Sequence, residues 1–255
     1  MAGRFFTAFF AAAAACAPAS ASPWNRDDGG IFLASTASYY FSDTQQSKYT
    51  RIDADTYLEF GLSDNWMASG RVSYGVSTTD TDADSFTDNG LNEAELSIQR
   101  QLQRGLHSAT AIKLSGVRSG ALSIDAQSGA PTPNMEIELR ALHGRDLVLN
   151  PVKVFAAGEV AYRRRFGGDA DQVRADALIG VEPSRSWLVL LEAQSIVSLQ
   201  NEDPGFADFD LYKAQASIVW RKSRRWSIVV GGRKEFATRN IAPGTTAFIG
   251  LWSEF

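Results

Sequence analysis

Charged side chains occupy every second position in several segments of this 255-residue chain. In residues 51–62, the positions of Arg51, Asp53, Asp55 and Glu59 alternate with apolar or small residues, and residues 135–141 ("MEIELRA") repeat the pattern. An alternation of period two places all the charges on one face of a β-strand, whereas a helix would scatter them around its surface. Charges gathered on one face can pair with one another, bind an ion or a sugar, or line a polar path.

Two β architectures fit this alternation. A soluble sandwich would turn the charged face to water, whereas a transmembrane barrel would turn the apolar face to lipid and the charges inward. In the barrel interpretation, two hypotheses remain for the charges: a salt-bridge network that stiffens the wall, or a selective path for solutes. Both signs are present, so no strong ion preference is predicted. The predicted lumen residues are Arg51, Asp53, Asp55, Glu59, Arg71, Glu93, Glu95, Lys113, Glu136, Glu138, Arg140, Glu159, Arg163, Arg165, Arg174, Asp176, Glu182, Glu192, Lys213, Arg233 and Glu235.

The segment "YRRRF", residues 162–166, is the most concentrated cationic stretch. Alternation predicts that Arg163 and Arg165 point inward near the outer mouth and that Arg164 points outward. Guanidinium groups there could hold an anionic sugar or a lipopolysaccharide phosphate by paired hydrogen bonds. Pairing with lumen acids such as Asp176 is the simpler interpretation.

A second charged stretch is acidic, with Asp80, Asp82, Asp84 and Asp88 inside a predicted loop. Alternating aspartates in a flexible loop can bind Ca²⁺, but this loop lacks the bidentate Glu and the fixed Gly of an EF-hand. A solvated loop is therefore favoured, and no metal site is predicted.

Candidates for catalysis are few, because His107 and His143 are the only histidines and Cys16 is the only cysteine. His107 is predicted to lie in the lumen beside the turn at Gly105, and His143 beside the next turn. Neither has an obvious nucleophile close by in sequence, although triads are assembled in space. No phosphate-binding Gly loop and no His/Cys metal spacing occur. We therefore predict no enzymatic activity, no catalytic residue and no cofactor; an outer-membrane hydrolase acting on lipid or polysaccharide is the alternative.

The strand pattern predicts about twelve strands whose connections alternate in length. Short connections at one end and longer ones at the other are typical of transmembrane barrels, with short periplasmic turns and longer outer loops. The stretch 143–151 is longer than this rule expects. The predicted strands lie near 31–41, 49–62, 66–77, 91–102, 106–117, 135–142, 152–165, 173–182, 187–198, 210–221, 226–236 and 245–255; the longer predicted loops are 77–89, 118–134, 199–209 and 237–244.

The aromatic residues separate toward the two ends of these strands. Such separation predicts two aromatic girdles at the membrane interfaces, and it favours the barrel over a soluble core plugged by Trp. The predicted girdle residues are Trp66, Trp187, Trp220 and Trp226 at the periplasmic end, and Tyr40, Tyr74, Tyr162 and Tyr212 at the outer end. The chain ends in Phe255, as outer-membrane barrels commonly do, but Ser253 stands where an apolar residue is usual and Trp252 is predicted to point inward.

Residues 1–21 read as a secretory signal peptide, with a positive start, an apolar run and a small-residue end that predicts cleavage after Ala21. A lipoprotein signal with Cys16 as the modified residue is the alternative. Residues 22–30 are then a short periplasmic segment, and residues 31–255 form the barrel. No stretch of 18 apolar residues predicts a membrane helix, and no basic run predicts nucleic-acid binding. The expected location is the bacterial outer membrane.

Three stretches carry a family resemblance: "YLEFGLSDNW", "AYRRRFGGDADQVRADALIGVEPSRSWLVLLEAQS" and "KEFATRNIAPGTTAFIGLWSEF". They resemble proteobacterial outer-membrane barrels of the exopolysaccharide-associated XagA-like group. The resemblance implies passive transport or a surface-polysaccharide context, and it supplies no catalytic residues. The expected partners are outer-membrane lipid, lipopolysaccharide, and exopolysaccharide or its secretion machinery. We therefore predict a passive channel or accessory for solute or exopolysaccharide passage, with a plugged structural barrel as a further alternative.

Overall fold

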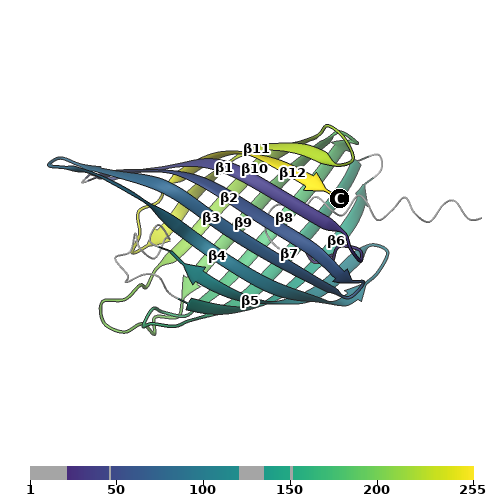
Figure 1. Cartoon of the computed structure of the whole chain (residues 1–255), viewed down its shortest axis with the longest axis horizontal. Coiled ribbons are helices and arrows are strands. Elements are labelled where there is room, and N and C mark those ends of the chain that lie inside the picture. Colours follow the sequence, from purple (N-terminus) through teal and green to yellow (C-terminus); the bar gives the residue numbers. More distant parts are fainter. Residues whose placement is uncertain (1–21, 46, 121–134, 150–151) are drawn as a thin grey trace, which may run out of the picture.

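Twelve antiparallel strands close into one barrel in the computed structural model, which describes residues 22–45, 47–120, 135–149 and 152–255 (Figure 1). Each strand pairs with the next along the chain, and β1 pairs with β12, so the sheet has no free edge. The predicted barrel of about twelve strands is confirmed. The strands are β1 (Ile31–Asp43), β2 (Ser47–Ser63), β3 (Trp66–Thr81), β4 (Ser85–Arg104), β5 (Ser108–Ser119), β6 (Met135–Leu149), β7 (Val152–Arg165), β8 (Gln172–Ser184), β9 (Trp187–Ser198), β10 (Asp210–Arg221), β11 (Trp226–Arg239) and β12 (Thr245–Glu254).

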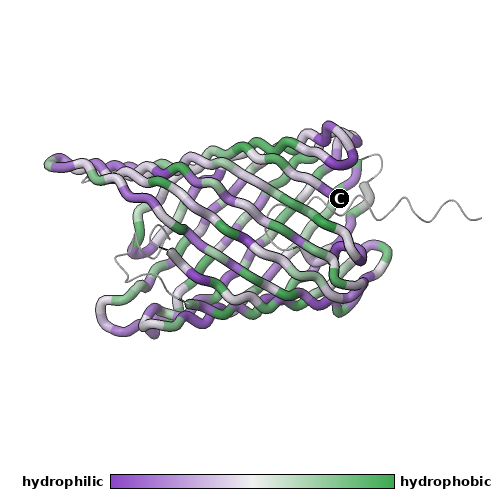
Figure 2. The backbone as a smooth tube through the Cα atoms, viewed as in Figure 1, coloured by the Kyte–Doolittle hydropathy of each residue, from purple (hydrophilic) through white to green (hydrophobic). Residues whose placement is uncertain are grey.

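The outer surface of the barrel is apolar. Along β2, Ile52 and Leu58 are exposed while Asp53 and Glu59 between them are buried, and Leu96 of β4 is 76% exposed. Apolar segments run along the length of the strands (Figure 2). A soluble monomer rarely exposes an apolar patch larger than a few hundred Å², so this surface is suited to lipid rather than to water.

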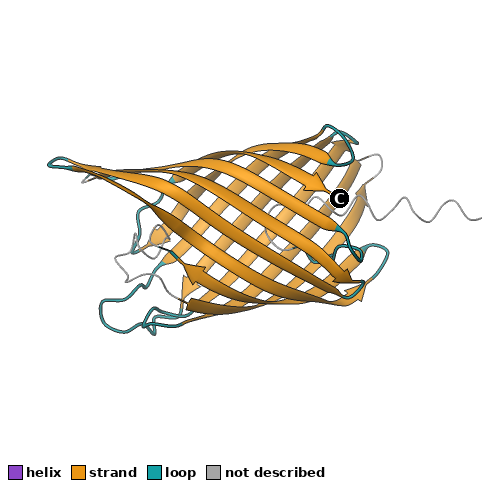
Figure 3. Ribbon diagram, viewed as in Figure 1, coloured by secondary structure: helices purple, strands orange, loops and turns teal. Residues whose placement is uncertain are grey.

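All regular structure in the described residues is β-strand, joined by loops and turns (Figure 3). A helix of the length and apolarity needed to cross a membrane does not occur in this part of the chain. The soluble sandwich is excluded, because there is a single closed sheet rather than two facing ones.

The two ends of the barrel differ in their connections. We call the end with residues 64–65, 105–107, 185–186 and 222–225 the turn end; the C-terminus lies there (Figure 1). The opposite end, with connections such as 166–171, 199–209 and 240–244, is the loop end.

Two predicted connections are wrong. Residues 143–149 belong to β6, which removes the one turn that looked too long. Residues 77–89 are mostly strand, because β3 runs to Thr81 and β4 starts at Ser85, and the two form a hairpin that projects beyond the barrel (Figure 1). Its Thr and Ser residues pair their backbones across the hairpin as any strand does, so polar composition alone was a poor guide to a loop.

Residues 22–27, here called the N-terminal plug, enter the lumen at the turn end. Two glutamines of β4 hold its backbone: Gln99 Nε2 donates to the Ser22 carbonyl at 2.7 Å, and Gln101 Nε2 donates to the Pro23 carbonyl at 2.8 Å. The Gln101 Oε1 atom also accepts the Asn25 N–H at 2.9 Å. Because buried backbone groups need partners, these bonds fix the path of the plug.

A glycine makes room for the plug on the opposite wall. A Cβ atom on Gly144 of β6 would lie 2.5 Å from the Trp24 ring and 2.6 Å from Pro23. Any larger residue there would therefore push the plug away from the wall.

Beside the plug, the turn end of the lumen is apolar rather than charged. We call the buried set Phe32, Ala34, Tyr57, Leu178, Leu188, Leu190, Val219, Val229 and Trp252 the apolar cluster. Trp252 points inward, as predicted. The cluster meets the plug at Arg26, whose guanidinium lies 4.4 Å from the Phe32 ring centroid and pairs with Glu59. Plug and cluster together fill the turn end.

Candidate functional site in the lumen

A buried ionic network covers the lumen wall formed by β6 and β7. Cross-strand register places Glu136 opposite Arg165 and Glu138 opposite Arg163. Arg163 binds Glu136 through Nη1 and Glu138 through Nε, both at 2.8 Å. Glu136 is 1% exposed and Arg163 is 3% exposed, so these charges have lost their water and depend on one another. We call Glu136, Glu138, Arg140, Arg163 and Arg165 the ionic wall.

The ionic wall continues into β8 and the loop end. Arg140 binds Glu138 at 2.8 Å and Asp176 of β8 at 2.6 Å. Arg165 binds Asp169 at 3.1 Å. The partners of the inward "YRRRF" arginines are thus mainly Glu136 and Glu138 of β6; the suggested pairing with Asp176 belongs to Arg140 instead. Their engagement favours the salt-bridge hypothesis over anion binding for this stretch.

The predicted lumen residues all lie on the inner face of the strands. Alternation alone was enough to place them. It missed the neutral members of the lining, such as Ser38, Asn92, Gln215 and Thr246, because uncharged polar residues leave a weak pattern. Asn92 was further hidden by an irregularity in the pairing of β3 with β4, which turns both Asn92 and Glu93 toward the lumen.

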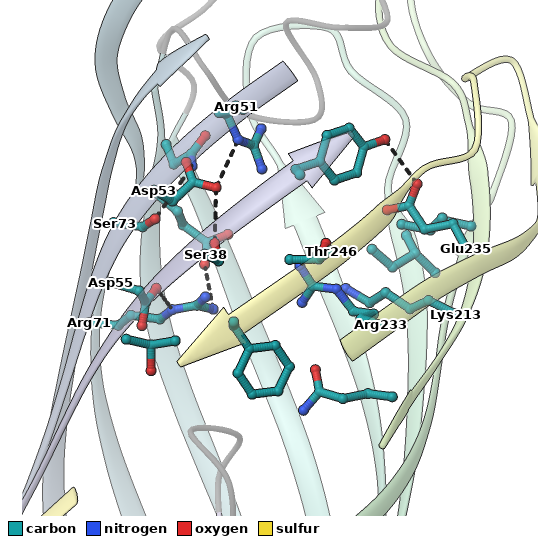
Figure 4. Close-up of a pocket in the computed structure, with 18 of the residues that line it drawn as sticks. Ser38, Arg51, Asp53, Asp55, Arg71, Ser73, Lys213, Arg233, Glu235 and Thr246 are labelled. Atoms are coloured by element: carbon teal, nitrogen blue, oxygen red, sulfur yellow. Dashed lines mark hydrogen bonds and ion pairs between the residues drawn. The ribbon is translucent and has the colours of Figure 1, made fainter. Parts of the chain in front are cut away.

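A polar cavity of about 300 Å³ lies inside the barrel, and strands from both sides line it (Figure 4). We call this the polar cavity. A second cavity of about 210 Å³ shares Arg71, Arg163, Lys213 and Arg233 with it. The lumen therefore holds polar space, bounded at the turn end by the apolar cluster.

The walls of the polar cavity differ in how their charges are matched. On β2 and β3, Arg51 binds Asp53 at 2.9 Å and Arg71 binds Asp55 at 2.7 Å (Figure 4). On β10 and β11, neither Lys213 nor Arg233 forms an ion pair within the described part of the chain. The cavity thus has one neutralised wall and one wall with surplus positive charge.

The predicted aromatic girdle needs one correction. All four tryptophans lie outward and exposed at the turn end, where Trp187 and Trp220 stack with centroids 6.3 Å apart. Tyr74 and Tyr162 are exposed outward, and Tyr212 lies half-buried beside Phe236 on the outer face. Tyr40 points inward, is 5% exposed and donates to Glu235 at 3.1 Å, because strand parity gives the outward position to its neighbour Tyr39.

The last strand accommodates its unusual serine. Ser253 lies opposite Trp226 and Leu33 in the adjacent strands and is buried. The Trp226 and Phe255 rings meet edge to face at 6.1 Å. Aromatic neighbours therefore surround the position where an apolar residue is usual.

The two histidines lie away from the lumen. The prediction that His107 lies inside is wrong, because it is exposed in the turn 105–107. His143 is on the outer face, with Nδ1 2.9 Å from Thr110 Oγ1 of β5. In the residues that the structure describes, no three His, Cys, Asp or Glu side chains gather as a metal site.

An ordered carboxylate organises the loop end. Asp171 accepts hydrogen bonds from the Arg165 N–H at 3.0 Å, Tyr162 Oη at 2.8 Å and Asn201 Nδ2 at 3.1 Å, and it pairs with the outward Arg164 at 2.6 Å. Burial alone would raise the pKa of Asp171, but these donors outweigh it and lower the pKa from 3.8 to about 2.

This pKa predicts how the loop responds to acid. A carboxyl whose pKa is lower in the folded state stabilises that state above its unfolded pKa, and the contribution is lost as the pH falls through the folded pKa. Loop 166–171 is therefore expected to keep its order at pH 5 and to lose it between about pH 4 and pH 2. Hydrogen exchange of the Arg165 amide, corrected for intrinsic rates, measures this. Asp171→Asn should raise exchange several-fold at pH 7, and Asp203→Asn in the neighbouring loop is the control; equal exchange in both variants would contradict the role of Asp171.

The fold has relatives among solved structures, all of low sequence identity. An outer membrane channel from Pseudomonas putida F1 matches with a TM-score of 0.70 and 10% identity, covering 91% of this chain and 97% of that one. The KdgM porin matches at 0.56 and 6%, covering 86% and 99%. The translocator domain of the autotransporter NalP from Neisseria meningitidis matches at 0.52 and 12%, covering 90% of each chain. These likenesses show the outer-membrane barrel fold.

No protein-family model matches the chain, and no curated protein matches its sequence. The resemblance to the XagA-like group is therefore not confirmed, whereas the likeness to channels and porins is.

Proposed function

We propose that this chain is a channel of the bacterial outer membrane that admits small polar solutes from the loop end. One observation carries the proposal: a polar cavity lies inside a closed barrel whose outer surface is apolar. Lipid on the outside and water on the inside satisfy both surfaces at once. The outward tryptophans at the turn end support a membrane interface there, with that end in the periplasm.

In the conformation described here, the channel is closed. The apolar cluster and the N-terminal plug occupy the turn end of the lumen, and hydrophobic constrictions exclude water and ions. Solute passage would require the plug to leave its place between β4 and β6. Among the solved relatives, the names of the Pseudomonas channel and of the KdgM porin support transport as the general role.

A role in exopolysaccharide passage is the finer proposal, and it is supported by the XagA-like resemblance alone. A polysaccharide strand would have to thread the turn end, which is filled by the largest fully buried apolar side chains of that region, Phe32, Leu188 and Leu190. The geometry therefore favours a small solute. Lipopolysaccharide and an export partner stay proposals for the loop end and the projecting hairpin.

The filled turn end also favours a second candidate, a barrel that serves as a structural or assembly partner without conducting. Planar-bilayer recording of residues 22–255 separates the two. A channel is expected to show rare discrete steps that grow with KCl concentration. His143→Ala is the control for the hydrolase alternative and should leave these steps unchanged. A folded barrel without steps, both in this form and without residues 22–27, would rule out the channel.

A further inference from the structure

The surplus charge of the polar cavity is concentrated on two residues, Lys213 of β10 and Arg233 of β11. Glu235 is the cross-strand neighbour of Lys213. Its carboxylate is turned away, since it accepts hydrogen bonds from Tyr40 Oη at 3.1 Å and from the Gly244 N–H at 2.8 Å (Figure 4). The nearest candidate counter-ion is thus already engaged, and within the described residues the ammonium of Lys213 has no ion-pair partner.

Arg233 is also incompletely satisfied. Its Nη2 atom donates to Thr246 Oγ1 at a long 3.3 Å, and its Nε atom is buried without a hydrogen-bond partner among the described residues. An unpaired buried donor on a charged group is costly, so its persistence indicates a place for an acceptor that the chain itself does not supply. Lys213 and Arg233 lie together on the same wall of the cavity (Figure 4).

The rest of the lining is suited to hydroxyl groups. Ser38, Thr36, Ser217 and Thr246 present hydroxyls to the cavity, and Gln215 presents an amide. The Phe248 ring also lines it and gives an apolar surface to a ligand face. A volume of about 300 Å³ falls at the small end of known ligand sites.

We propose that the polar cavity binds a hydroxylated carboxylate of monosaccharide size, a sugar acid, with its carboxylate held between Lys213 and Arg233. A guanidinium offers two parallel donors to a carboxylate, and an ammonium adds a point charge beside it. The hydroxyl-bearing side chains then take the ring hydroxyls. The inference deepens the proposed channel by giving its cargo a charge and a class, yet binding at this site does not require the turn end to open.

Calorimetric titration of the folded barrel in detergent micelles tests the site. The probes are glucuronate and glucose, which differ only in the carboxylate that replaces one CH₂OH group. We expect glucuronate to bind and glucose to bind at least about tenfold more weakly, since a hydrogen-bonded charge contributes on the order of 1.5–3 kcal/mol. Equal affinity for the two sugars, or no binding of glucuronate by the folded protein, would overturn the proposal.

Charge-matched variants locate the site. Lys213→Gln and Arg233→Gln should each weaken glucuronate binding about tenfold or more. Lys234→Gln removes the same charge from the outer face of β11 and should leave binding unchanged. The conservative Arg233→Lys variant should retain part of the affinity. Equal losses in the Lys213 and Lys234 variants would show a general charge effect and contradict a built site.

Recording in bilayers keeps this inference separate from the proposed function. In a KCl gradient, an open form should prefer chloride, and Lys213→Gln/Arg233→Gln should move the reversal potential toward cation preference. If no form of the protein conducts but glucuronate binds as expected, the binding site stands and the channel fails. If the barrel conducts without distinguishing glucuronate from glucose, the channel stands and the site fails.

Discussion

A barrel lacking residues 22–27 is expected to conduct through steps several-fold larger than those of residues 22–255. The plug fills the β4–β6 side of the turn end through backbone bonds to Gln99 and Gln101, so its removal leaves polar side chains facing an open space that water can enter. The apolar cluster stays in place on the other side and limits the diameter. Single-channel recording across a KCl series measures the change.

A point substitution tests the same idea without shortening the chain. Gly144→Val should mimic the deletion, because a Cβ atom at this position would lie 2.5 Å from the Trp24 ring. Gly116→Val is the matched control, since a Cβ atom on Gly116 meets nothing within 4 Å. If both plug variants fold, as judged by heat-modifiable mobility, and conduct like the control, then the apolar cluster alone closes the lumen.

Replacing Arg163 with Met should destabilise the barrel by about 3–5 kcal/mol, the usual cost of removing one partner from a buried ion pair. The variant strands the carboxylates of Glu136 and Glu138, which Arg163 binds at 2.8 Å each. The free energy of unfolding, from urea titration in lipid vesicles, measures the loss.

The neighbouring Arg164→Met variant is the control for this prediction. Arg164 lies on the outer face with its side chain 54% exposed, and it forms only the pair with Asp171, so about 1 kcal/mol or less is expected. Adding Glu138→Gln to Arg163→Met should recover part of the loss, because it removes a stranded charge. Equal unfolding energies for the Arg163 and Arg164 variants would show that the ionic wall is hydrated and adds little.

Strand parity allowed most of the wall to be predicted from sequence. Where a strand carries charge on one face and apolar groups on the other, as around Glu136 and Glu138, the inner face is unambiguous, and the charged lining was placed correctly. Parity also predicts the inward position of Tyr40, which the aromatic-girdle rule overrode wrongly.

The parts that sequence missed lack such contrast. Leu188 and Leu190 alternate with Val189 and Leu191, so both faces of β9 are apolar and nothing marks which one forms the cluster. The plug depends on Gln99 and Gln101 bonding to backbone carbonyls, a contact that leaves no residue pattern in the plug itself. The surplus charge of Lys213 and Arg233 depends on where the Glu235 carboxylate turns, which is a question of side-chain geometry.

The burial of Ser22 imposes an order of events on maturation. Ser22 is 2% exposed and its carbonyl is held by Gln99, while a few residues later Ile31 N and O bond to Phe255 and complete the barrel. A peptidase cutting after Ala21 needs that bond extended and accessible, so it must act before the plug is enclosed. The last residue of the chain must also have been delivered before the seam with β1 can form. Export, trimming, threading of the plug and closure of the seam therefore follow one another in time, and a defect in trimming would appear as a failure of assembly.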